Sequence, residues 1–371
     1  MTLESVVAES SIVLCCGTGG VGKTTTAAAV ALHGARLGRR CVVVTIDPAK
    51  RLADALGVEG LTNSPSQIDG DWPGELWALM LDTKTTFDEL VARNAADTGQ
   101  AQRIYGNRFY RNISDRLSGT QEYMAMEKLY ELHEQSRFDL VVVDTPPTAN
   151  ALDFLDAPDR LMDALDSATM KWFVQAFEKI GKLSINLLAK SAAVVLRGIG
   201  RITGGGFLED MAELITDLND LFGGFKQRAA IVHQTLRSKD VAFVLVTSPA
   251  PMSLREVRYF AERLIEHQMP LGAFVVNRLH LPPSGAKQPA TEAQAAAALA
   301  SSTLDGSLGD DGPRRVVRSH ADAFALAALD ARHLTVIDEF ASTAPVIRVA
   351  ELASDVHDIP LLAQLADTLT A

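Results

Sequence analysis

A glycine-rich run near the amino terminus carries the clearest chemical signature in the chain. It reads Gly-Thr-Gly-Gly-Val-Gly-Lys-Thr over Gly17–Thr24 and matches the pattern GxxxxGK followed by Ser or Thr. The run follows an apolar, strand-like stretch, Ile12–Cys16, and precedes a helix-forming stretch, Thr25–Arg36. In this setting, backbone N–H groups curl around phosphate oxygens at the positive end of a helix. The run therefore predicts a nucleotide phosphate site rather than a plain glycine turn.

The side chains of this run have separate roles. The Lys23 ammonium is placed to neutralise the β- and γ-phosphates, and the Thr24 hydroxyl is placed to bind Mg²⁺. We therefore expect ATP and Mg²⁺ as cofactors, with Lys23 taking part in catalysis. The loop residues expected to bind ATP are Gly17, Thr18, Gly19, Gly20, Val21, Gly22, Lys23, Thr24 and Thr25.

Two aspartates, Asp47 and Asp144, directly follow apolar, strand-like runs. In a parallel sheet, the carboxyl ends of the strands face the ligand crevice. There Asp144 can hold Mg²⁺, directly or through a water molecule, in the Walker B role. Asp47 can orient or deprotonate the attacking water, which makes it the second candidate catalytic residue. The structural alternatives are helix caps, and Pro48 after Asp47 suits a first helical position.

The run Asn277-Arg278-Leu279-His280 bears on the choice of base. GTP-specific relatives carry Asn-Lys-x-Asp at this place, and the Asp bonds guanine. The fourth position here is His280, so the aspartate that would hydrogen-bond guanine is absent. This absence favours ATP over GTP. The Asn277 amide can hydrogen-bond an adenine edge, although a turn residue is the alternative reading.

Short apolar runs alternate with helical patterns along the chain. Most of these runs are continuous, which is typical of strands buried on both faces of a parallel sheet. The pattern predicts an α/β fold: a doubly wound, mostly parallel sheet with an inserted α-helical subdomain. The expected strands are Ile12–Cys16, Cys41–Ile46, Leu140–Val143, Val241–Val246, Ala273–Val276 and Leu334–Ile337.

Two segments interrupt this alternation. Residues 84–137 read as a helical insertion, and residues 159–237 read as a helical subdomain mounted on the sheet. Both belong to one expected P-loop ATPase domain over residues 1–371. The stretch Leu281–Gly312 is rich in Pro, Ala, Ser and Gly, so we expect part of it to be a mobile loop. Its alanine run, Ala295–Ala300, is compatible with a helix.

Composition excludes several classes of protein. The chain has 371 residues, with 35 Lys and Arg against 46 Asp and Glu, a formal net charge of −11. A globally basic nucleic-acid binder is therefore not expected. The three cysteines, Cys15, Cys16 and Cys41, lie in apolar runs and form no CxxC pair. They are expected to be buried small hydrophobes, not a zinc site or a disulfide framework.

The amino terminus and the apolar windows of the chain bear on its localisation. The first ten residues contain no Lys or Arg, so they lack the charged region of a signal peptide. The most apolar later window, Leu183–Ile202, is interrupted by Lys190, Arg197 and Arg201. Since a central Lys or Arg disfavours a membrane-spanning helix, we expect a soluble, cytoplasmic protein with at most peripheral membrane contact.

Together these residues resemble the ArsA-type ATPases, which include the arsenite-pump ATPase and the cytosolic ATPases that deliver tail-anchored membrane proteins. The resemblance looks closest to the actinobacterial ArsA-like ATPases that occur as adjacent pairs. The matching segments are Gly17–Thr25 (the deviant Walker loop), Asp47-Pro48-Ala49 with Leu52 (switch I), Gly119 with Glu122, Val143–Thr148 (switch II), Val275–Asn277, and Ala344–Leu352 (the adenine-side loop).

The resemblance implies a Mg²⁺-dependent, ATP-hydrolysing dimer with ATP at or near the subunit interface. It assigns water activation to Asp47 and the Mg²⁺ shell to Asp144. The adenine-side loop adds Pro345 and Val346 to the residues expected to bind ATP.

Three departures from the family pattern stand out. Thr18 replaces the signature lysine that reaches across the dimer to the partner's phosphates. Asn150 replaces the usual histidine of switch II, and the metalloid-binding cysteines and zinc CxxC are missing. The lost lysine predicts slow hydrolysis by this chain alone and a second ArsA-like subunit that carries the lysine.

The block 159–237 occupies the place where targeting members build a groove for an apolar client helix. Its candidate client surface is Trp172, Phe173, Phe177, Leu187 and Leu188. The alternatives are core packing and transient contact of a basic stripe with anionic lipid, the stripe being Lys179, Lys182, Asn186, Lys190, Arg197 and Arg201.

The leading functional hypothesis is an ATP-hydrolysing switch that handles tail-anchored or other hydrophobic membrane-protein clients. One alternative is the energising ATPase subunit of an anion or metalloid efflux system, against which the missing cysteines count. Another is a partition or positioning ATPase on nucleic acid, which needs a basic surface and usually keeps the signature lysine.

Overall fold

The structure is a computed structural model. It describes residues 2–47, 49–108, 110–111, 120–146, 214, 217, 227–228, 230–283, 286–302, 308–341 and 344–371. The candidate client surface, the basic stripe and Asn150 lie outside the described residues, as do Gly119 and Thr148.

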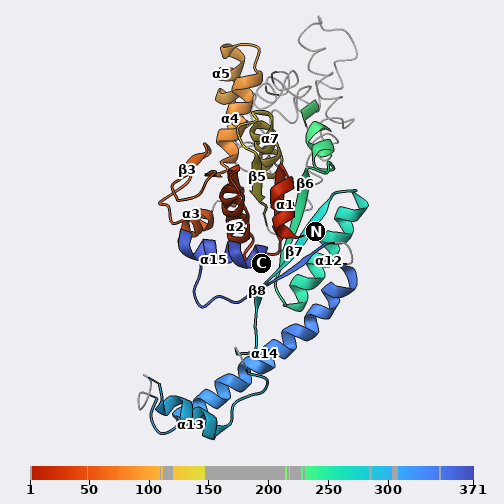
Figure 1. The fold of residues 1–371 in the computed structure, drawn as a ribbon. Helices are drawn as coiled ribbons and strands as arrows, with labels where there is room; N and C mark the ends of the chain where they lie inside the picture. Colours follow the sequence, from red (N-terminus) through yellow and green to blue (C-terminus); the bar gives the residue numbers. More distant parts are fainter. Residues whose placement is uncertain are drawn as a thin grey trace, which may run out of the picture.

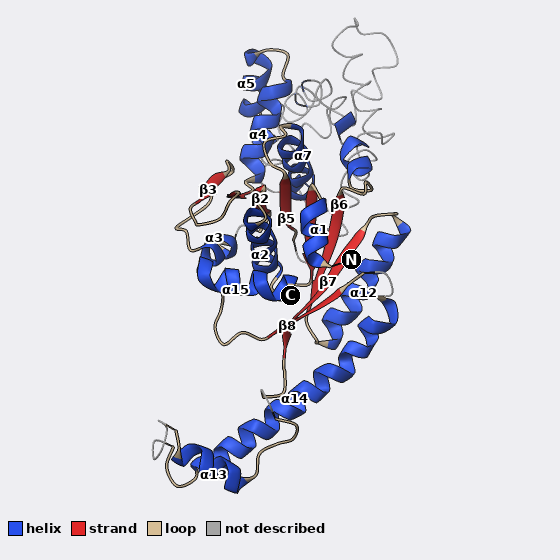
Figure 2. Ribbon diagram, in the orientation of Figure 1, coloured by secondary structure: helices blue, strands red, loops and turns tan. Residues whose placement is uncertain are grey.

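The centre of the structure is an eight-stranded sheet with the order β3-β4-β2-β5-β1-β6-β7-β8 (Figure 2). All neighbouring strands are parallel except β3 and β4. The predicted doubly wound, mostly parallel sheet is therefore confirmed. The strands are β1 (Ile12–Gly17), β2 (Arg40–Thr45), β3 (Ser66–Ile68), β4 (Glu75–Met80), β5 (Leu140–Asp144), β6 (Val241–Thr247), β7 (Leu271–Leu279) and β8 (Val346–Ala350).

Helices cover both faces of the sheet (Figure 1). Alternate residues of β1 enter different cores: Ile12 and Leu14 join one cluster, and Val13 and Cys15 join the other. This explains why the interior positions of the central strands form continuous apolar runs. The first cluster contains side chains of α4 (Thr83–Asn94), α5 (Thr98–Gly106), α7 (Thr120–Glu134) and α12 (Pro251–Glu266). The second contains side chains of α1 (Leu3–Glu9), α2 (Lys23–Arg36), α3 (Arg51–Leu56) and α15 (Ile359–Thr370).

One predicted strand is wrong. Leu334–Ile337 lies inside α14, a helix of 29 residues over Gly312–Phe340. Its buried positions Ala327, Asp330, Leu334 and Ile337 recur at spacings of three and four residues, which is the period of a helix. The short β-branched run therefore belongs to one apolar face of a long helix. The strand that completes this side of the sheet is β8 instead.

The segment after β7 forms a projecting arm. The predicted alanine helix is confirmed as α13 (Glu292–Ala300), which begins with a capping box between Thr291 and Gln294. Figure 1 shows α13 alongside the distal part of α14, with both helices extending away from the sheet.

The helical insertion begins with two aspartate-capped helices. Asp82 accepts a hydrogen bond from the Thr85 N–H at the start of α4, and Asp97 accepts one from Gln100 at the start of α5. The described residues of block 159–237 pack against this insertion: Asp217 is ion-paired with Arg103 at 2.8 Å. The two helical segments, separate in the sequence, thus share contacts beside the sheet.

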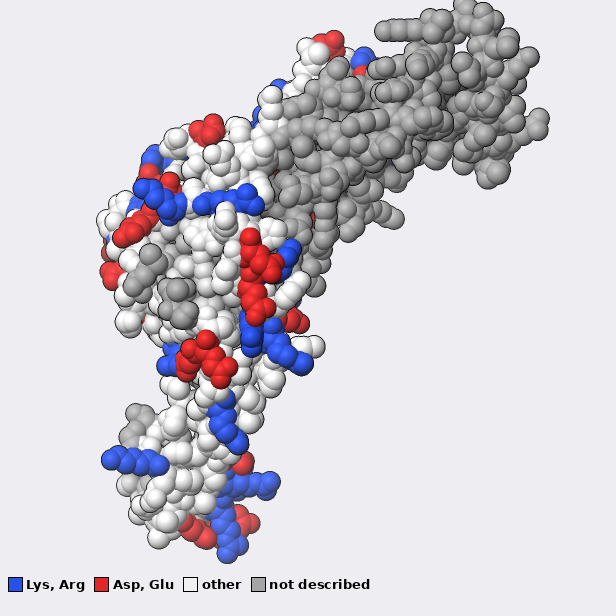
Figure 3. Space-filling view, turned by 90° about the vertical axis from the view of Figure 1, so that its right-hand side faces the viewer, with Lys and Arg blue, Asp and Glu red and all other residues white. Residues whose placement is uncertain are grey.

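Three general expectations can be compared with the structure. Cys15, Cys16 and Cys41 are buried and unpaired, as predicted. On the face drawn in Figure 3, acidic and basic side chains are interspersed over the body of the protein. No helix in the described part of the chain is long and apolar enough to span a bilayer.

Candidate nucleotide-hydrolysis site

The loop between β1 and α2 has the backbone of a phosphate cradle. Gly20 and Gly22 adopt φ values of 78° and 94°, in the region that favours glycine. A Cβ atom at Gly22 would lie 2.4 Å from Asn277 Nδ2, so this position also needs a residue without a side chain. The loop leads directly into α2, whose first residue is Lys23. Backbone N–H groups and the helix dipole are thereby directed at one anion site.

Lys23 is held inside this loop. Its side chain is 7% exposed, and Nζ donates a hydrogen bond to the Thr18 carbonyl oxygen at 2.8 Å. Burial lowers the pKa of the ammonium, while the nearby Asp144 carboxylate opposes that shift. A phosphate that binds in the cradle would offer this buried cation a charged partner in place of a carbonyl.

Asp144, at the end of β5, is the most buried acid of the site, with 1% of its surface exposed. Its Oδ2 accepts hydrogen bonds from Thr24 at 2.7 Å and from Thr45 at 2.9 Å. Burial raises the pKa of Asp144 to about 6, and the two hydroxyl donors oppose that rise. Thr45 was not predicted from the sequence. The feature that could have indicated its role is its place in the sheet, because Thr45 ends β2 and is paired with Asp144 in the β2–β5 register.

These groups fit a Mg²⁺ ion. Asp144 Oδ1 is buried and has no hydrogen-bond partner among the described residues, so one carboxylate oxygen remains for a cation or its water. Carboxylate and hydroxyl oxygens are ligands that Mg²⁺ prefers. Thr24 and Asp144 would hold the ion, which when bound supplies charge neutralisation to the phosphates.

Asp47 lies just beyond β2 and organises its own segment. Oδ1 accepts a hydrogen bond from the Ala49 N–H at 2.9 Å, and Oδ2 lies 3.3 Å from an Arg51 guanidinium nitrogen. The capping alternative is wrong, because α3 begins at Arg51 with Lys50 at its N-cap. Asp47 instead closes a short turn before the helix, which keeps its carboxylate at the carboxyl edge of the sheet.

Asn277 reaches the phosphate loop. Its Nδ2 donates to the Val21 carbonyl oxygen at 2.9 Å, and its Oδ1 accepts from the Arg278 N–H at 2.9 Å. The amide thus fastens β7 to the loop, a contact that the sequence did not indicate. Binding of adenine by Asn277 remains a proposal. His280 stands where GTP-specific proteins carry the guanine-binding aspartate. Its Nδ1 is hydrogen-bonded to Asp330 of α14 at 2.8 Å.

Pro345 and Val346 are not brought to the same place. They stand at the start of β8, where Val346 is level with Phe274, and the Pro345 carbonyl accepts a bond from the Phe274 N–H. The carboxyl edge of β8 is at Ala350, opposite Leu279. Pro345 and Val346 therefore lie at the amino end of β8, one strand length away from the carboxyl edge at which contacts with adenine are expected. The sequence did not reveal β8, since this short edge strand is only partly buried.

Thr18 turns its side chain toward α12. Its hydroxyl donates to Ser253 Oγ at 3.3 Å, and the residue is 9% exposed. Thr18 therefore makes a hydrogen bond within its own chain. It cannot supply the positive charge that the family's signature lysine carries.

The site combines a phosphate-binding loop, a buried lysine and two carboxylates at one edge of the sheet, one of which has an oxygen available to a cation. This combination defines a P-loop nucleotide hydrolase. The family profile of the anion-transporting ATPases matches residues 10–302. The chain belongs to this family, and its reaction is ATP hydrolysis with Mg²⁺.

Individual proteins are also similar to this chain over most of its length. The chain is 25% identical to the ATPase GET3 of Malassezia globosa over 290 residues, which cover 77% of this chain and 78% of the relative. It is 27% identical to the ATPase GET3 of Podospora anserina over 290 residues, 76% of this chain and 78% of the relative.

Proposed function

We propose that this protein is an ATP-driven dimeric switch that handles tail-anchored or other hydrophobic membrane-protein clients. The observation that carries the proposal is that a phosphate loop and two carboxylates at one sheet edge occur in a chain that matches the ATPases GET3 over about three quarters of its length. The targeting ATPases for tail-anchored proteins are one of the two branches that the sequence resembles. The candidate client surface is Trp172, Phe173, Phe177, Leu187 and Leu188.

The cysteines argue against the metalloid alternative. Cys15 and Cys16 lie within β1, and Cys41 lies in β2, where all three are buried. Burial raises the pKa of Cys16 and of Cys41 to about 12, so neither thiol is readily ionised. Because a metalloid binds thiolates, the chain offers it no accessible ligand of that kind.

The active assembly is proposed to contain a second, similar subunit. Side chains of this chain would form most of one nucleotide site. Lys23 would contact the phosphates, and Thr24 and Asp144 would hold Mg²⁺. Asp47 would orient the attacking water. The lost cation at Thr18 would have acted in the partner's site. A partner subunit that keeps the signature lysine would restore that charge at the site formed by this chain, whereas a homodimer would lack it at both sites.

The test uses a defined apolar ligand. Asp47→Asn, which we expect to bind ATP without hydrolysing it, would be titrated with a labelled 20-residue apolar helix in detergent-free buffer, in ATP and in ADP. The matched control is the same peptide with three central residues replaced by Lys. We expect capture of the apolar peptide in one nucleotide state only. Equal or absent binding in both states would exclude the client function.

Hydrogen exchange gives a second measure of the same proposal. Exchange across residues 159–237 should differ between ATP and ADP in the protein with its natural partner subunit. Identical exchange in every nucleotide state would make this block a scaffold.

A further inference from the structure

The segment that carries Asp47 is attached to the sheet just before that residue. The Leu81 N–H donates to the Thr45 carbonyl at 2.9 Å, and the Ile46 N–H donates to the Asp144 carbonyl at 3.3 Å. Beyond Ile46 the side-chain bonds of Asp47 stay within its own segment, to Ala49 and Arg51. The orientation of the Asp47 carboxylate therefore depends on how the Ile46–Asp47 peptide is held.

A distant glutamine holds that peptide. Gln121, in the first turn of α7, donates a hydrogen bond from Nε2 to the Ile46 carbonyl oxygen at 2.8 Å. The two residues are 75 positions apart in sequence. The N–H of the same peptide, that of Asp47, donates to Thr45 Oγ1 at 3.3 Å, within its own segment. Loss of the Gln121 bond would therefore remove the hold that a separate element has on this peptide, at the point where the ladder of β2 has ended.

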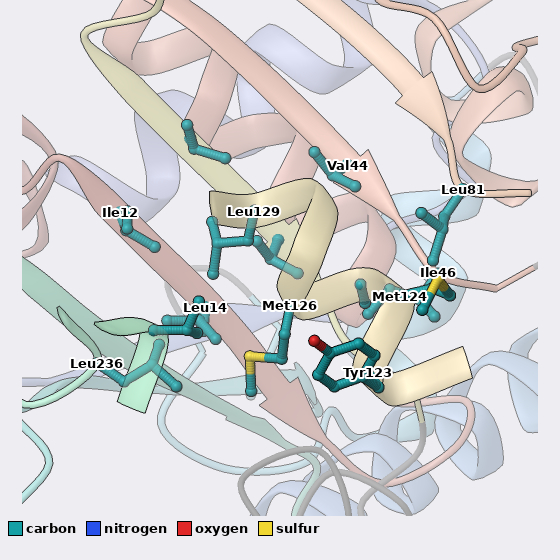
Figure 4. Packing of buried hydrophobic residues seen from close by; sticks show 14 of the residues in the cluster. Ile12, Leu14, Val44, Ile46, Leu81, Tyr123, Met124, Met126, Leu129 and Leu236 are labelled. Atoms are coloured by element: carbon teal, nitrogen blue, oxygen red, sulfur yellow. The ribbon is translucent and has the colours of Figure 1, made fainter. Parts of the chain in front are cut away.

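The helix that presents Gln121 is itself firmly anchored. Figure 4 shows Met124 of α7 beside Ile46, and Met126 near Leu14 of β1. Tyr123 and Leu129 of α7 belong to the same buried cluster. Farther along α7, Glu127 accepts a hydrogen bond from the Arg228 guanidinium at 2.9 Å. A donor on such a helix has little freedom to follow a moving segment, because interiors are close-packed. Gln121 can thus impose a position on its acceptor.

We propose that Gln121 is a positioning residue for Asp47, acting through the Ile46 carbonyl. The inference rests on the proposed role of Asp47 in orienting the attacking water. Displacement of a catalytic group by about 1 Å can lower a rate by about a hundredfold. A side chain with no direct contact to the carboxylate can therefore influence turnover strongly.

The central variant is Gln121→Met, which keeps the length of the side chain and removes the donor. We expect kcat for ATP to fall about tenfold to a hundredfold, with the dissociation constant for ATP unchanged, since Lys23 and Thr24 are untouched. Gln135→Met is the matched control: Gln135 lies just after α7, and its exposed amide bonds only Glu131 among the described residues. It should keep normal turnover.

Two further measurements separate positioning from a general structural defect. In nucleotide-free Gln121→Met, the amides of Asp47, Ala49 and Lys50 should exchange faster, while those of the phosphate loop keep their rates. The double variant Gln121→Met with Asp47→Asn should be no slower than Asp47→Asn alone, because both changes remove the same function.

The outcomes are distinguishable. If Asp47→Asn is slow but Gln121→Met has normal turnover and exchange, the positioning role is refuted and the hydrolytic assignment of Asp47 stands. Additive losses in the double variant also refute positioning. If Asp47→Asn keeps normal turnover, the assignment of Asp47 itself fails.

Discussion

The hydroxyl of Thr24 donates to Asp144 Oδ2 at 2.7 Å, which joins the first turn of α2 to the end of β5. The two residues are 120 positions apart, and Asp144 is also bonded by Thr45 from the neighbouring strand. Both donors occupy one carboxylate oxygen and leave Oδ1 without a partner among the described residues. The site is therefore already assembled around a carboxylate of which one oxygen is hydrogen-bonded and the other is not.

The first prediction follows from this unsatisfied acid. Asp144→Asn should stabilise the nucleotide-free, Mg²⁺-free protein at pH 7–8, by up to about 3 kcal/mol in the free energy of unfolding. In the folded state the Asp144 pKa is raised from 3.8 to about 6, so ionisation destabilises the fold. The penalty is complete above pH 6 and disappears below pH 3.8. Urea unfolding at pH 8 and at pH 4 would measure it.

Asp139→Asn gives the contrasting control. Hydrogen bonds from Arg40 lower the pKa of Asp139, so its charge stabilises the fold at neutral pH and this benefit is lost as the pH falls. The two variants should therefore shift stability in opposite directions at pH 8. A destabilised Asp144→Asn at pH 8 would contradict the first prediction.

The second prediction concerns Lys23. Lys23→Ala should weaken ATP binding by about 3 kcal/mol, roughly a hundredfold, since a buried charge-assisted bond to phosphate is lost. Calorimetric titration with ATP and GTP is the measurement, and the wild type should prefer ATP. Lys239→Ala, at an exposed turn before β6, is the control and should bind normally. Unchanged affinity in Lys23→Ala would refute the phosphate assignment.

The third prediction addresses Thr18. The isolated chain should hydrolyse ATP slowly, and Thr18→Lys should accelerate it, because a cation acting across an interface can be worth roughly 10³–10⁵ in rate. Steady-state ATPase activity of the wild type, of Thr18→Lys and of each mixed with a lysine-bearing paralogue would test this. Ser253→Ala is the control for losing the Thr18–Ser253 contact and should leave turnover slow. Fast wild-type turnover that Thr18→Lys does not change would show that the charge is unnecessary.

The fourth prediction uses the thiols. Native protein at pH 8 should react very slowly with a bulky thiol reagent, and all three cysteines should react after unfolding. Burial raises the pKa of Cys15, Cys16 and Cys41 and also blocks access to them. Mass spectrometry of the labelled protein would count the modified sites. Rapid labelling of the native state would contradict the packing of β1 and β2.

Local sequence was sufficient for the phosphate loop and for the central strands. The loop needs glycines at defined spacing followed by Lys and Thr, and β1, β5 and β6 are apolar up to their last residue because both faces of each strand are covered. Asp47 and Asp144 could be placed at one edge because parallel strands end together. These are properties of short segments, so they can be read without knowing the rest of the chain.

Tertiary structure alone decided which distant residues complete the site. Thr45 and Gln121 become partners of Asp144 and Ile46 only when strand register and helix packing bring them within hydrogen-bond distance. Packing also made Leu334–Ile337 part of a helix, although the run alone favours a strand, because one face of α14 is buried over its proximal turns. Local propensity is worth at most about 1 kcal/mol per residue, so burial against a neighbouring element overrides it.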